Sequence, residues 1–273
     1  MMFTFETTDL GKDYPDLLAK VMHFGALVKP RGELIREVRP LILRLEFPER
    51  CIVQRPGFSR ALMWLEVLSL LSGEFDRSLF EVVSPDAAKR LNAYGAYGPR
   101  VKEQLLEAER ELRRDPDSRR ALVYVGRPDD LRLSLELEMP CTATWQFFKR
   151  DGKLEMIVNM RSWDLVWGLS YDVPCFVAMQ WAMASALRIP MGTYTHIAGS
   201  GHIYERHFEL APGANIADSF ELPFGIYSIA QWQNEAHTTL DAVRAAAKPN
   251  GSFYVPSSWV PQARAIIKKL RKE

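Results

Sequence analysis

A long apolar run at residues 173–189 constrains the fold of this chain more than any other feature. The run reads VPCFVAMQWAMASALRI and would place apolar side chains on every side of a helix. Such a helix is stable only when it is buried all round, and Pro174 is acceptable in a first helical turn. The segment is therefore predicted to be a core helix that starts near Pro174.

A second buried helix is predicted at residues 59–71, SRALMWLEVLSLL. It stops before Gly73, a residue typical of a helix C-terminal cap. Glu66 lies in its middle, where a desolvated carboxylate without a partner costs several kcal/mol. Glu66 is therefore expected to reach a polar cavity or to have a raised pKa, which makes it a candidate site residue. The alternative is a glutamate on a narrow solvent-exposed stripe.

Residues 101–120, VKEQLLEAERELRRDPDSRR, are typical of an amphipathic helix that ends near Asp115 and Pro116. The turn that follows presents Arg119 and Arg120 side by side, and residues 121–125 are predicted to be a strand. Paired guanidinium groups suit a phosphate because each offers a planar fork of donors. The alternative is two solvated surface arginines.

A second strand is predicted at residues 153–161, KLEMIVNMR, because apolar and polar side chains alternate along it. Residues 161–176, RSWDLVWGLSYDVPCF, are then predicted to be a loop between this strand and the core helix. That stretch places Asp164 and Asp172 among tryptophans, leucines and valines. Two carboxylates in such apolar surroundings are candidate catalytic or ligand-binding residues.

Charge and cysteine content restrict the classes of function. The formal charge is +1 for 273 residues, so the broad basic surface of a sequence-blind nucleic-acid binder is not expected. No apolar segment approaches the ~20 residues that span a bilayer, and we expect a cytoplasmic protein without membrane or nucleic-acid partners. Cys51, Cys141 and Cys175 are an odd number without CxxC spacing, which argues against a disulfide framework and a zinc site. One domain over residues 1–273 is the simplest organisation.

In this order, the motifs resemble the thymidylate synthase superfamily from about residue 31 to residue 207. The resemblance is carried by seven segments: KPRGELIRE, LEVLSLLSG, NAYGAYGPR, DPDSRR, PCTATWQF, MRSWDLVWGLSYD and GHIYERH. It implies an α+β, thymidylate synthase-like fold, in which a large twisted sheet flanked by helices packs against the sheet of a second subunit. It also implies a pyrimidine nucleoside monophosphate substrate and 5,10-methylenetetrahydrofolate as co-substrate, with no metal.

The resemblance assigns roles residue by residue. The catalytic group consists of the nucleophile Cys141 together with Glu66, Tyr97 and Asp172, and Asp164 would face the folate. Phosphate would be held by Arg31, Arg161 and Ser162, and by Arg119 and Arg120 donated across a homodimer interface. The remaining nucleotide contacts would be made by Gln146, by Gly168, which leaves room near the pyrimidine, and by His202 and Tyr204, which would bind the ribose 3'-hydroxyl.

Asp172 departs from the family pattern, in which this position is an asparagine. An asparagine amide donates to the 4-oxo group of uracil and accepts from N3–H. Cytosine reverses both demands, and a protonated aspartic acid meets them, as does an aspartate facing cytosine protonated at N3. An ionised aspartate facing uracil would leave polar groups unpaired, which can discriminate by several kcal/mol. The sequence therefore predicts a cytosine nucleotide, dCMP or CMP.

Two further departures concern the product. Thr142 follows the nucleophile where thymidylate synthases usually have histidine, and the segment ARAIIKKLRKE lacks their short apolar tail. These features resemble the deoxycytidylate and cytidylate 5-hydroxymethylases, in which water is the final nucleophile. The alternatives are a cytidylate 5-methyltransferase, a thymidylate synthase or uridylate hydroxymethylase that tolerates Asp172, a catalytically silent nucleotide-binding protein, and an unrelated α+β domain.

Overall fold

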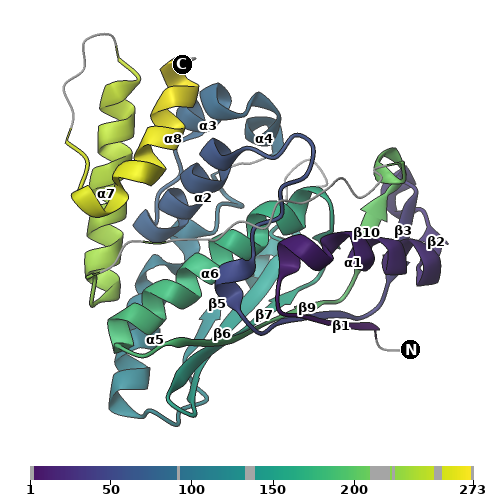
Figure 1. The fold of residues 1–273 in the computed structure, drawn as a ribbon, viewed down its shortest axis with the longest axis horizontal. Coiled ribbons are helices and arrows are strands. Elements are labelled where there is room, and N and C mark those ends of the chain that lie inside the picture. The colour runs from purple at the N-terminus through teal and green to yellow at the C-terminus, as the bar shows by residue number, and fades with distance from the viewer. Residues whose placement is uncertain are drawn as a thin grey trace.

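A six-stranded mixed sheet carries the fold (Figure 1). The structure, a computed structural model, describes residues 3–90, 93–132, 139–209, 222, 225–248 and 254–271. Strands β1 and β4, and strands β7 and β9, pair parallel, and the other neighbours pair antiparallel. In sheet order the strands are β1 (Phe3–Thr7), β4 (Leu41–Leu45), β9 (Met191–Ala198), β7 (Lys153–Met160), β6 (Thr142–Arg150) and β5 (Leu122–Tyr124).

A smaller four-stranded sheet continues from two strands of the large one. Its order is β2 (Ala26–Val28), β3 (Ile35–Val38), β10 (Gly201–Tyr204) and β8 (Trp163–Asp164). Strand β8 follows β7 along the chain, β10 follows β9, and the two pair parallel with Asp164 opposite His202. The motif residues on both strands are therefore brought to one place.

The predicted core helix is present as α6 (Trp167–Leu187), and most of its residues are buried. It packs on β7 and β9 of the large sheet, and α2 (Arg60–Ser72) packs on α6 (Figure 1). The prediction of where it starts was wrong, because the helix begins at Trp167 and Pro174 lies inside it. Most of residues 161–176 are thus strand β8 and helix α6.

The early start of α6 has a visible cause in Asp164. Its Oδ1 atom accepts hydrogen bonds from the backbone N–H groups of Val166 at 2.9 Å and Trp167 at 3.2 Å. A carboxylate that accepts from free N–H groups stabilises the first turn of a helix. Pro174 has no N–H for the carbonyl of Ser170, and burial of the surrounding side chains maintains the helix through this point.

Other predicted elements are confirmed. Ser59 accepts from Leu62 N–H at the start of α2, and Gly73 ends that helix with φ 75°, in the left-handed region that favours glycine. Helix α5 (Gly98–Arg114) ends at Asp115. Strands β5 and β7 lie where the sequence predicts them, and β7 alternates buried and partly exposed residues.

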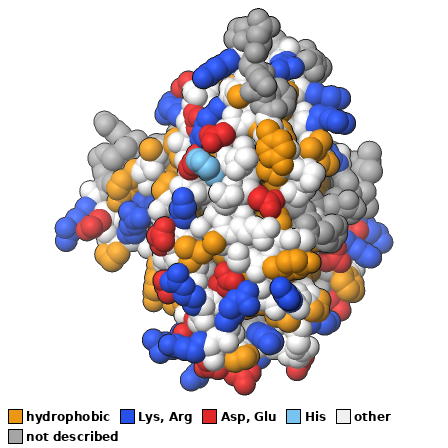
Figure 2. Space-filling view, turned by 90° about the vertical axis from the view of Figure 1, so that its left-hand side faces the viewer, with side chains coloured by type: hydrophobic (Ala, Val, Ile, Leu, Met, Phe, Trp, Pro, Cys, Tyr) orange, Lys and Arg blue, Asp and Glu red, His pale blue; other side chains and the backbone are white. Residues whose placement is uncertain are grey.

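Five further helices complete the described part of the chain. They are α1 (Leu10–Phe24), α3 (Arg77–Val83), α4 (Pro85–Arg90), α7 (Ile229–Ala246) and α8 (Val260–Arg271). Helices α7 and α8, in a region without a recognisable motif, both pack on α2 (Figure 1). Figure 2 shows acidic and basic side chains mixed over one face. None of the described helices is both long and apolar enough to span a bilayer.

Candidate active site

A cavity of about 310 Å³ lies against α2 and α6 and contains six of the predicted site residues. Apolar side chains from α2, from α3, from the turn between them and from the segment before Cys141 form part of its wall, including Leu62, Leu70, Phe75, Phe80, Met139 and Pro140. The predicted residues that line it are Glu66, Tyr97, Cys141, Asp164, Gly168 and Asp172. Residues separated by more than 100 positions therefore meet at one place.

Cys141 directly precedes β6 and is only partly buried. The backbone N–H of Arg161 donates to the Cys141 carbonyl at 2.8 Å. The guanidinium group of Arg161 donates to the carbonyls of Pro140 at 3.1 Å and Met139 at 2.8 Å. Arg161 thus holds the segment that carries the thiol, and it remains solvent-exposed. Phosphate binding by Arg161 and Ser162 stays a prediction.

Tyr97 precedes α5 and reaches the start of β6. Its hydroxyl oxygen accepts from the backbone N–H of Thr142 at 3.3 Å, one residue beyond Cys141. Its ring stacks on Phe176 of α6, with centroids 6.3 Å apart. Burial raises the pKa of Tyr97, and the neighbouring Cys141 and Asp172 add to the rise. The phenol is therefore neutral and can donate a proton in a hydrogen bond.

Glu66 has the raised pKa that its position in a buried helix predicts. Burial raises the pKa from 4.5 to about 8, and the charge of Asp172 contributes to the rise. The Cys175 thiol, whose Sγ lies 3.9 Å from Glu66 Oε2, opposes it. Glu66 is therefore largely protonated at neutral pH and can both give and take a proton.

Asp172 and Gly168 lie on the same side of α6, and Gly168 precedes Asp172 by one helical turn. Burial raises the pKa of Asp172 from 3.8 to about 7, and the charge of Asp164 adds to the rise. A β-carbon placed on Gly168 would lie 3.0 Å from Asp172 Oδ2 and 3.6 Å from Asp164 Cβ. Glycine is therefore the residue that keeps the space beside both carboxyl groups open.

His202 and Tyr204 lie on β10, beside the cavity. Their rings meet edge to face with centroids 5.0 Å apart, and His202 pairs in register with Asp164. Burial lowers the pKa of His202, against the raising effect of the Asp164 charge. Burial raises the pKa of Tyr204, and the positive charges of Arg206 and of Arg31, which has φ 52°, partly offset the rise.

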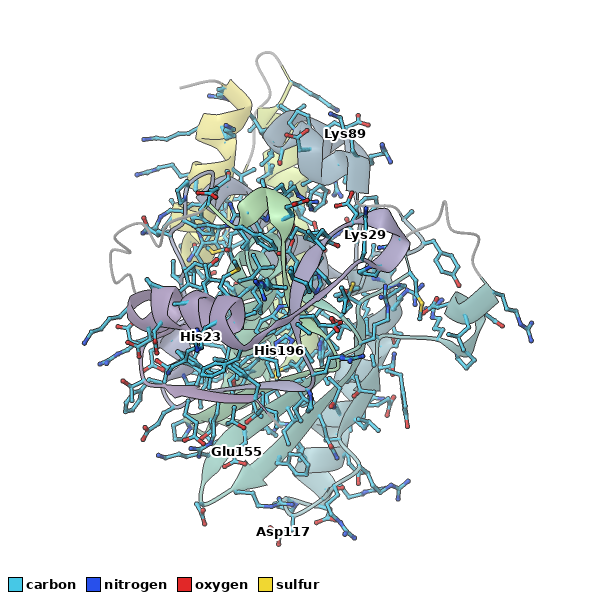
Figure 3. The ribbon with its side chains drawn as sticks, turned by 90° about the vertical axis from the view of Figure 1, so that its right-hand side faces the viewer. His23, Lys29, Lys89, Asp117, Glu155 and His196 are labelled. Carbon is cyan, nitrogen blue, oxygen red and sulfur yellow. The ribbon has the colours of Figure 1, made fainter. Side chains whose placement is uncertain are left out.

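Eight predicted residues do not line this cavity: Arg31, Arg119, Arg120, Gln146, Arg161, Ser162, His202 and Tyr204. Arg119 and Arg120 are exposed in the turn after α5, and Gln146 of β6 donates through Nε2 to the Arg119 carbonyl at 2.9 Å. Figure 3 places Asp117, in the same turn, at the opposite end of the molecule from Lys89 of α4. Helix α4 contributes Ala87 to the cavity wall. The nucleotide roles of these residues stay predictions.

Sequence reasoning assigned no site role to several polar or aromatic members of the cavity wall, among them Trp167 and Cys175. Trp167 donates through Nε1 to His207 Nε2 at 3.2 Å, and the Arg55 guanidinium lies 4.2 Å from its ring centroid. Helical spacing could have found Cys175, three residues after Asp172. That signal depends on a helix that begins before Asp172, which the sequence did not predict.

Among the residues that the structure describes, no three His, Cys, Asp or Glu side chains group as a metal site requires.

The raised pKa of Glu66 predicts a pH dependence of folding stability. The unfolded chain loses the Glu66 proton near pH 4.5 and the folded chain near pH 8. The folded state therefore binds more protons between these values, and the stabilisation from the protonated form is lost as pH rises through that window. Between pH 5 and pH 9 the free energy of unfolding should fall in the wild type. We expect this fall to be smaller in Glu66→Gln, by a few kcal/mol.

Urea unfolding followed at both pH values measures this difference. Glu103→Gln is the matched control, because Glu103 is an exposed glutamate of α5. It should retain the pH dependence of the wild type. Equal pH dependence in Glu66→Gln and the wild type would contradict the burial argument.

Comparisons with known proteins identify the family. Residues 85–235, more than half of the chain, match the thymidylate synthase family. The chain is also similar to the deoxyuridylate hydroxymethyltransferase of Bacillus phage SP01, with 26% identity over 253 residues. That alignment covers 82% of this chain and 64% of the relative, so the chain spans less than two thirds of the relative's length. The predicted α+β, thymidylate synthase-like fold is confirmed, and the chain belongs to the thymidylate synthase family.

Proposed function

We propose that the protein catalyses folate-dependent 5-hydroxymethylation of a cytosine nucleotide, dCMP or CMP. Membership of the thymidylate synthase family supports one-carbon transfer to a pyrimidine nucleotide. The observation that carries the choice of base is Asp172, a carboxyl group in the cavity whose pKa burial and Asp164 raise to about 7.

The state of Asp172 supports cytosine for a chemical reason. Near neutral pH a substantial fraction of Asp172 is protonated, and a protonated carboxyl group both donates and accepts. Its O–H can donate to the unprotonated N3 of cytosine, and its carbonyl oxygen can accept from the 4-amino group. Uracil presents N3–H and a 4-oxo group, so an ionised Asp172 would set a carboxylate oxygen against the 4-oxo oxygen and leave both without a donor.

Cys141 would act as the nucleophile. Its thiolate would add to C6 of the ring, which makes C5 electron-rich and able to attack a one-carbon unit. Donation from Arg161 to three successive carbonyls, of residues 139 to 141, supports a fixed position for this thiol. After C5 has attacked the methylene carbon, loss of the C5 proton and departure of tetrahydrofolate would leave an exocyclic methylene group. Water would add to this methylene, and departure of Cys141 from C6 would restore the C5–C6 double bond.

Glu66 and Tyr97 would take part in proton transfer and hydrogen bonding around the pyrimidine ring. Glu66, with a pKa of about 8, can accept the proton that C5 loses, directly or through water. Tyr97, neutral and bonded to the Thr142 N–H, lies beside both Cys141 and Asp172. The pair would also stabilise the charge that develops on the base.

The cavity wall suits a folate as co-substrate. 5,10-Methylenetetrahydrofolate would supply the one-carbon unit at the oxidation level of formaldehyde. Trp167 and the apolar side chains of Leu62, Leu70 and Phe80 offer a surface for flat aromatic rings, and Asp164 lies on the same wall.

We also propose the homodimer that the family resemblance implies. Arg119 and Arg120 are exposed and lie outside the cavity, so a phosphate role for them requires a second subunit. The face of the large sheet that α6 leaves uncovered carries partly exposed side chains, among them Phe148, Ile157 and Ile197. Such a face is suited to packing on the sheet of another copy.

A uracil nucleotide is the second candidate substrate, and a specific observation favours it. The Bacillus phage relative is a deoxyuridylate hydroxymethyltransferase. In that case Asp172 would have to face the 4-oxo group of uracil, and only its protonated form, with the proton on the oxygen beside that group, could donate to it.

One assay separates these candidates. The purified protein is incubated with methylenetetrahydrofolate and dCMP, CMP, dUMP or UMP, and the products are weighed by mass spectrometry. The proposal expects a 5-hydroxymethyl product from dCMP or CMP. A 5-methyl product would overturn the final step, and turnover of dUMP or UMP alone would overturn the choice of base.

A further inference from the structure

Trp163 and His196 form a fully buried stack against the cavity wall. Their ring centroids are 3.7 Å apart and their planes differ by 7°. Trp163 comes from β8 and His196 from β9, and neither side chain is exposed. The Tyr194 hydroxyl lies 2.8 Å from His196 Nδ1, and burial lowers the pKa of His196 to about 3. The His196 imidazole is therefore neutral and fixed in position, and the Trp163 indole stacks on it.

The Trp163 indole and the Asp172 carboxyl group flank a common point beside Gly168. A β-carbon at Gly168 would lie 3.6 Å from Trp163 Cδ1 and 3.0 Å from Asp172 Oδ2. Trp163 Nε1, the atom bonded to Cδ1, is buried, and its interaction with the Asp172 carboxyl group partly offsets the rise of the Asp172 pKa. Buried N–H donors are nearly always paired. The presence of this donor favours the ionised form of Asp172.

We propose that Trp163, held against His196, is a positioning residue that fixes the orientation of the Asp172 carboxyl group. The indole N–H approaches one carboxyl oxygen, and the acid proton is thereby directed to the other oxygen. This inference rests on the proposed function in one respect, since it specifies how the carboxyl group presents a donor and an acceptor to the base.

The orientation matters because a carboxyl group has two equivalent oxygens until something distinguishes them. The oxygen that faces an N–H donor is the poorer site for a proton, and it keeps a second lone pair for the 4-amino group of cytosine. The other oxygen then carries the proton towards N3. Trp163 would therefore contribute to the choice of base although it is not among the residues that line the cavity.

Other titratable groups also face Asp172, and the experiment must hold them constant. They come from β8, α2, α6, β9 and the segment before α5, and they are Asp164, Glu66, Cys175, Tyr194 and Tyr97. A substitution at Trp163 alters none of their charges, so a change in the titration of Asp172 reports on the indole itself.

The test is the replacement Trp163→Phe, which removes the N–H and keeps an aromatic ring on His196. Aspartate carboxyl carbons are labelled with ¹³C, and the Asp172 signal is identified by its loss in Asp172→Asn. We expect the Asp172 titration midpoint to move upwards by about one pH unit, because the ionised form loses a donor. Trp232→Phe is the matched control, since Trp232 is equally buried, lies on α7 and has no partner for its Nε1 among the described residues. The Asp172 titration midpoint in Trp232→Phe should equal that in the wild type.

A second readout is the ratio of kcat/KM for a cytosine nucleotide to that for the matching uracil nucleotide. We expect Trp163→Phe to lower this ratio roughly fivefold to tenfold, as expected for one lost hydrogen bond. If Trp163→Phe does not fold, benzothienylalanine at position 163 replaces the N–H with sulfur in a ring of the same shape.

The outcomes separate the two proposals. An unchanged Asp172 midpoint in the folded variant would overturn the role of Trp163, whatever the substrate is. A shifted midpoint in a protein that acts only on uracil nucleotides would retain the positioning role and overturn the cytosine assignment.

Discussion

Replacement of Cys141 with serine is expected to reduce turnover by roughly four orders of magnitude or more. The reason is chemical, because a serine hydroxyl remains protonated near neutral pH and adds poorly to C6 of a pyrimidine. Cys141 is partly exposed and lines the cavity beside Tyr97 and Asp172. The measurement is the rate of product formation with the best of the four nucleotides, under saturating methylenetetrahydrofolate.

Cys51→Ala provides the control for Cys141→Ser. Cys51 is a fully buried thiol that is not among the residues lining the cavity, and burial raises its pKa. Its variant should keep activity close to that of the wild type and lose only some stability to the cavity that the substitution leaves. Full activity in folded Cys141→Ser would exclude the proposed nucleophile.

A covalent adduct gives a direct view of the same step. A nucleotide with fluorine at C5 cannot lose that substituent as a proton, so the thioether at C6 is retained. With this nucleotide and the folate, the intact mass of the wild-type protein should increase by the combined mass of the two ligands. Cys141→Ser should show no increase, whereas Cys51→Ala should behave as the wild type.

Sequence alone could predict the elements whose pattern is local. The all-apolar helix α2 with its glycine cap, the amphipathic helix α5 and the alternating strand β7 follow from periodicities of 3.6 and 2.0. The buried position of Glu66 was predictable in the same way, because the cost of an isolated buried carboxylate does not depend on the rest of the fold.

The start of α6 was not predictable from local rules. Pro174 suits a first turn, and Val166 and Trp167 are not capping residues. The helix instead begins at Trp167 because the Asp164 carboxylate accepts from two N–H groups and because the core stabilises a proline inside the helix. The Asp164 cap and the packing around Pro174 together set this boundary.

The Trp163–His196 stack was not predictable either. The two residues are 33 positions apart, and they meet only because β8 continues from β7, which pairs parallel with β9. No spacing rule brings a tryptophan and a histidine together over that distance. A sequence motif identifies the residues that touch a ligand more readily than those that orient them.

Asp172→Asn is expected to move the base preference from cytosine towards uracil nucleotides by about 10²-fold to 10⁴-fold in the ratio of kcat/KM values. The asparagine NH₂ donates and its carbonyl accepts, which fits the 4-oxo group and N3–H of uracil. With cytosine, an amide held in that same orientation would place its NH₂ against the 4-amino group and its carbonyl oxygen against N3. Because each unpaired buried group costs about 1–3 kcal/mol, two mismatches account for the expected range.

The pH dependence adds a second test of Asp172. With a pKa of about 7, the protonated form is lost as pH rises through neutrality, so kcat/KM for a cytosine nucleotide should fall above pH 7 in the wild type. The asparagine variant has no proton to lose at this position, and its lower activity on cytosine should lack that step. Folding is checked by the thermal midpoint at pH 8, where removal of a carboxyl group with a raised pKa should not destabilise the protein.

Asp164→Asn is the contrasting substitution at the neighbouring carboxylate. Asp164 raises the pKa of Asp172 through its charge, so its removal should lower that pKa and move the cytosine pH profile to lower pH. The donor and acceptor of Asp172 would remain, and the base preference at low pH should stay with cytosine. Two outcomes would show that a residue other than Asp172 recognises the base. One is a reversal of the base preference in Asp164→Asn, and the other is an unchanged base preference in Asp172→Asn.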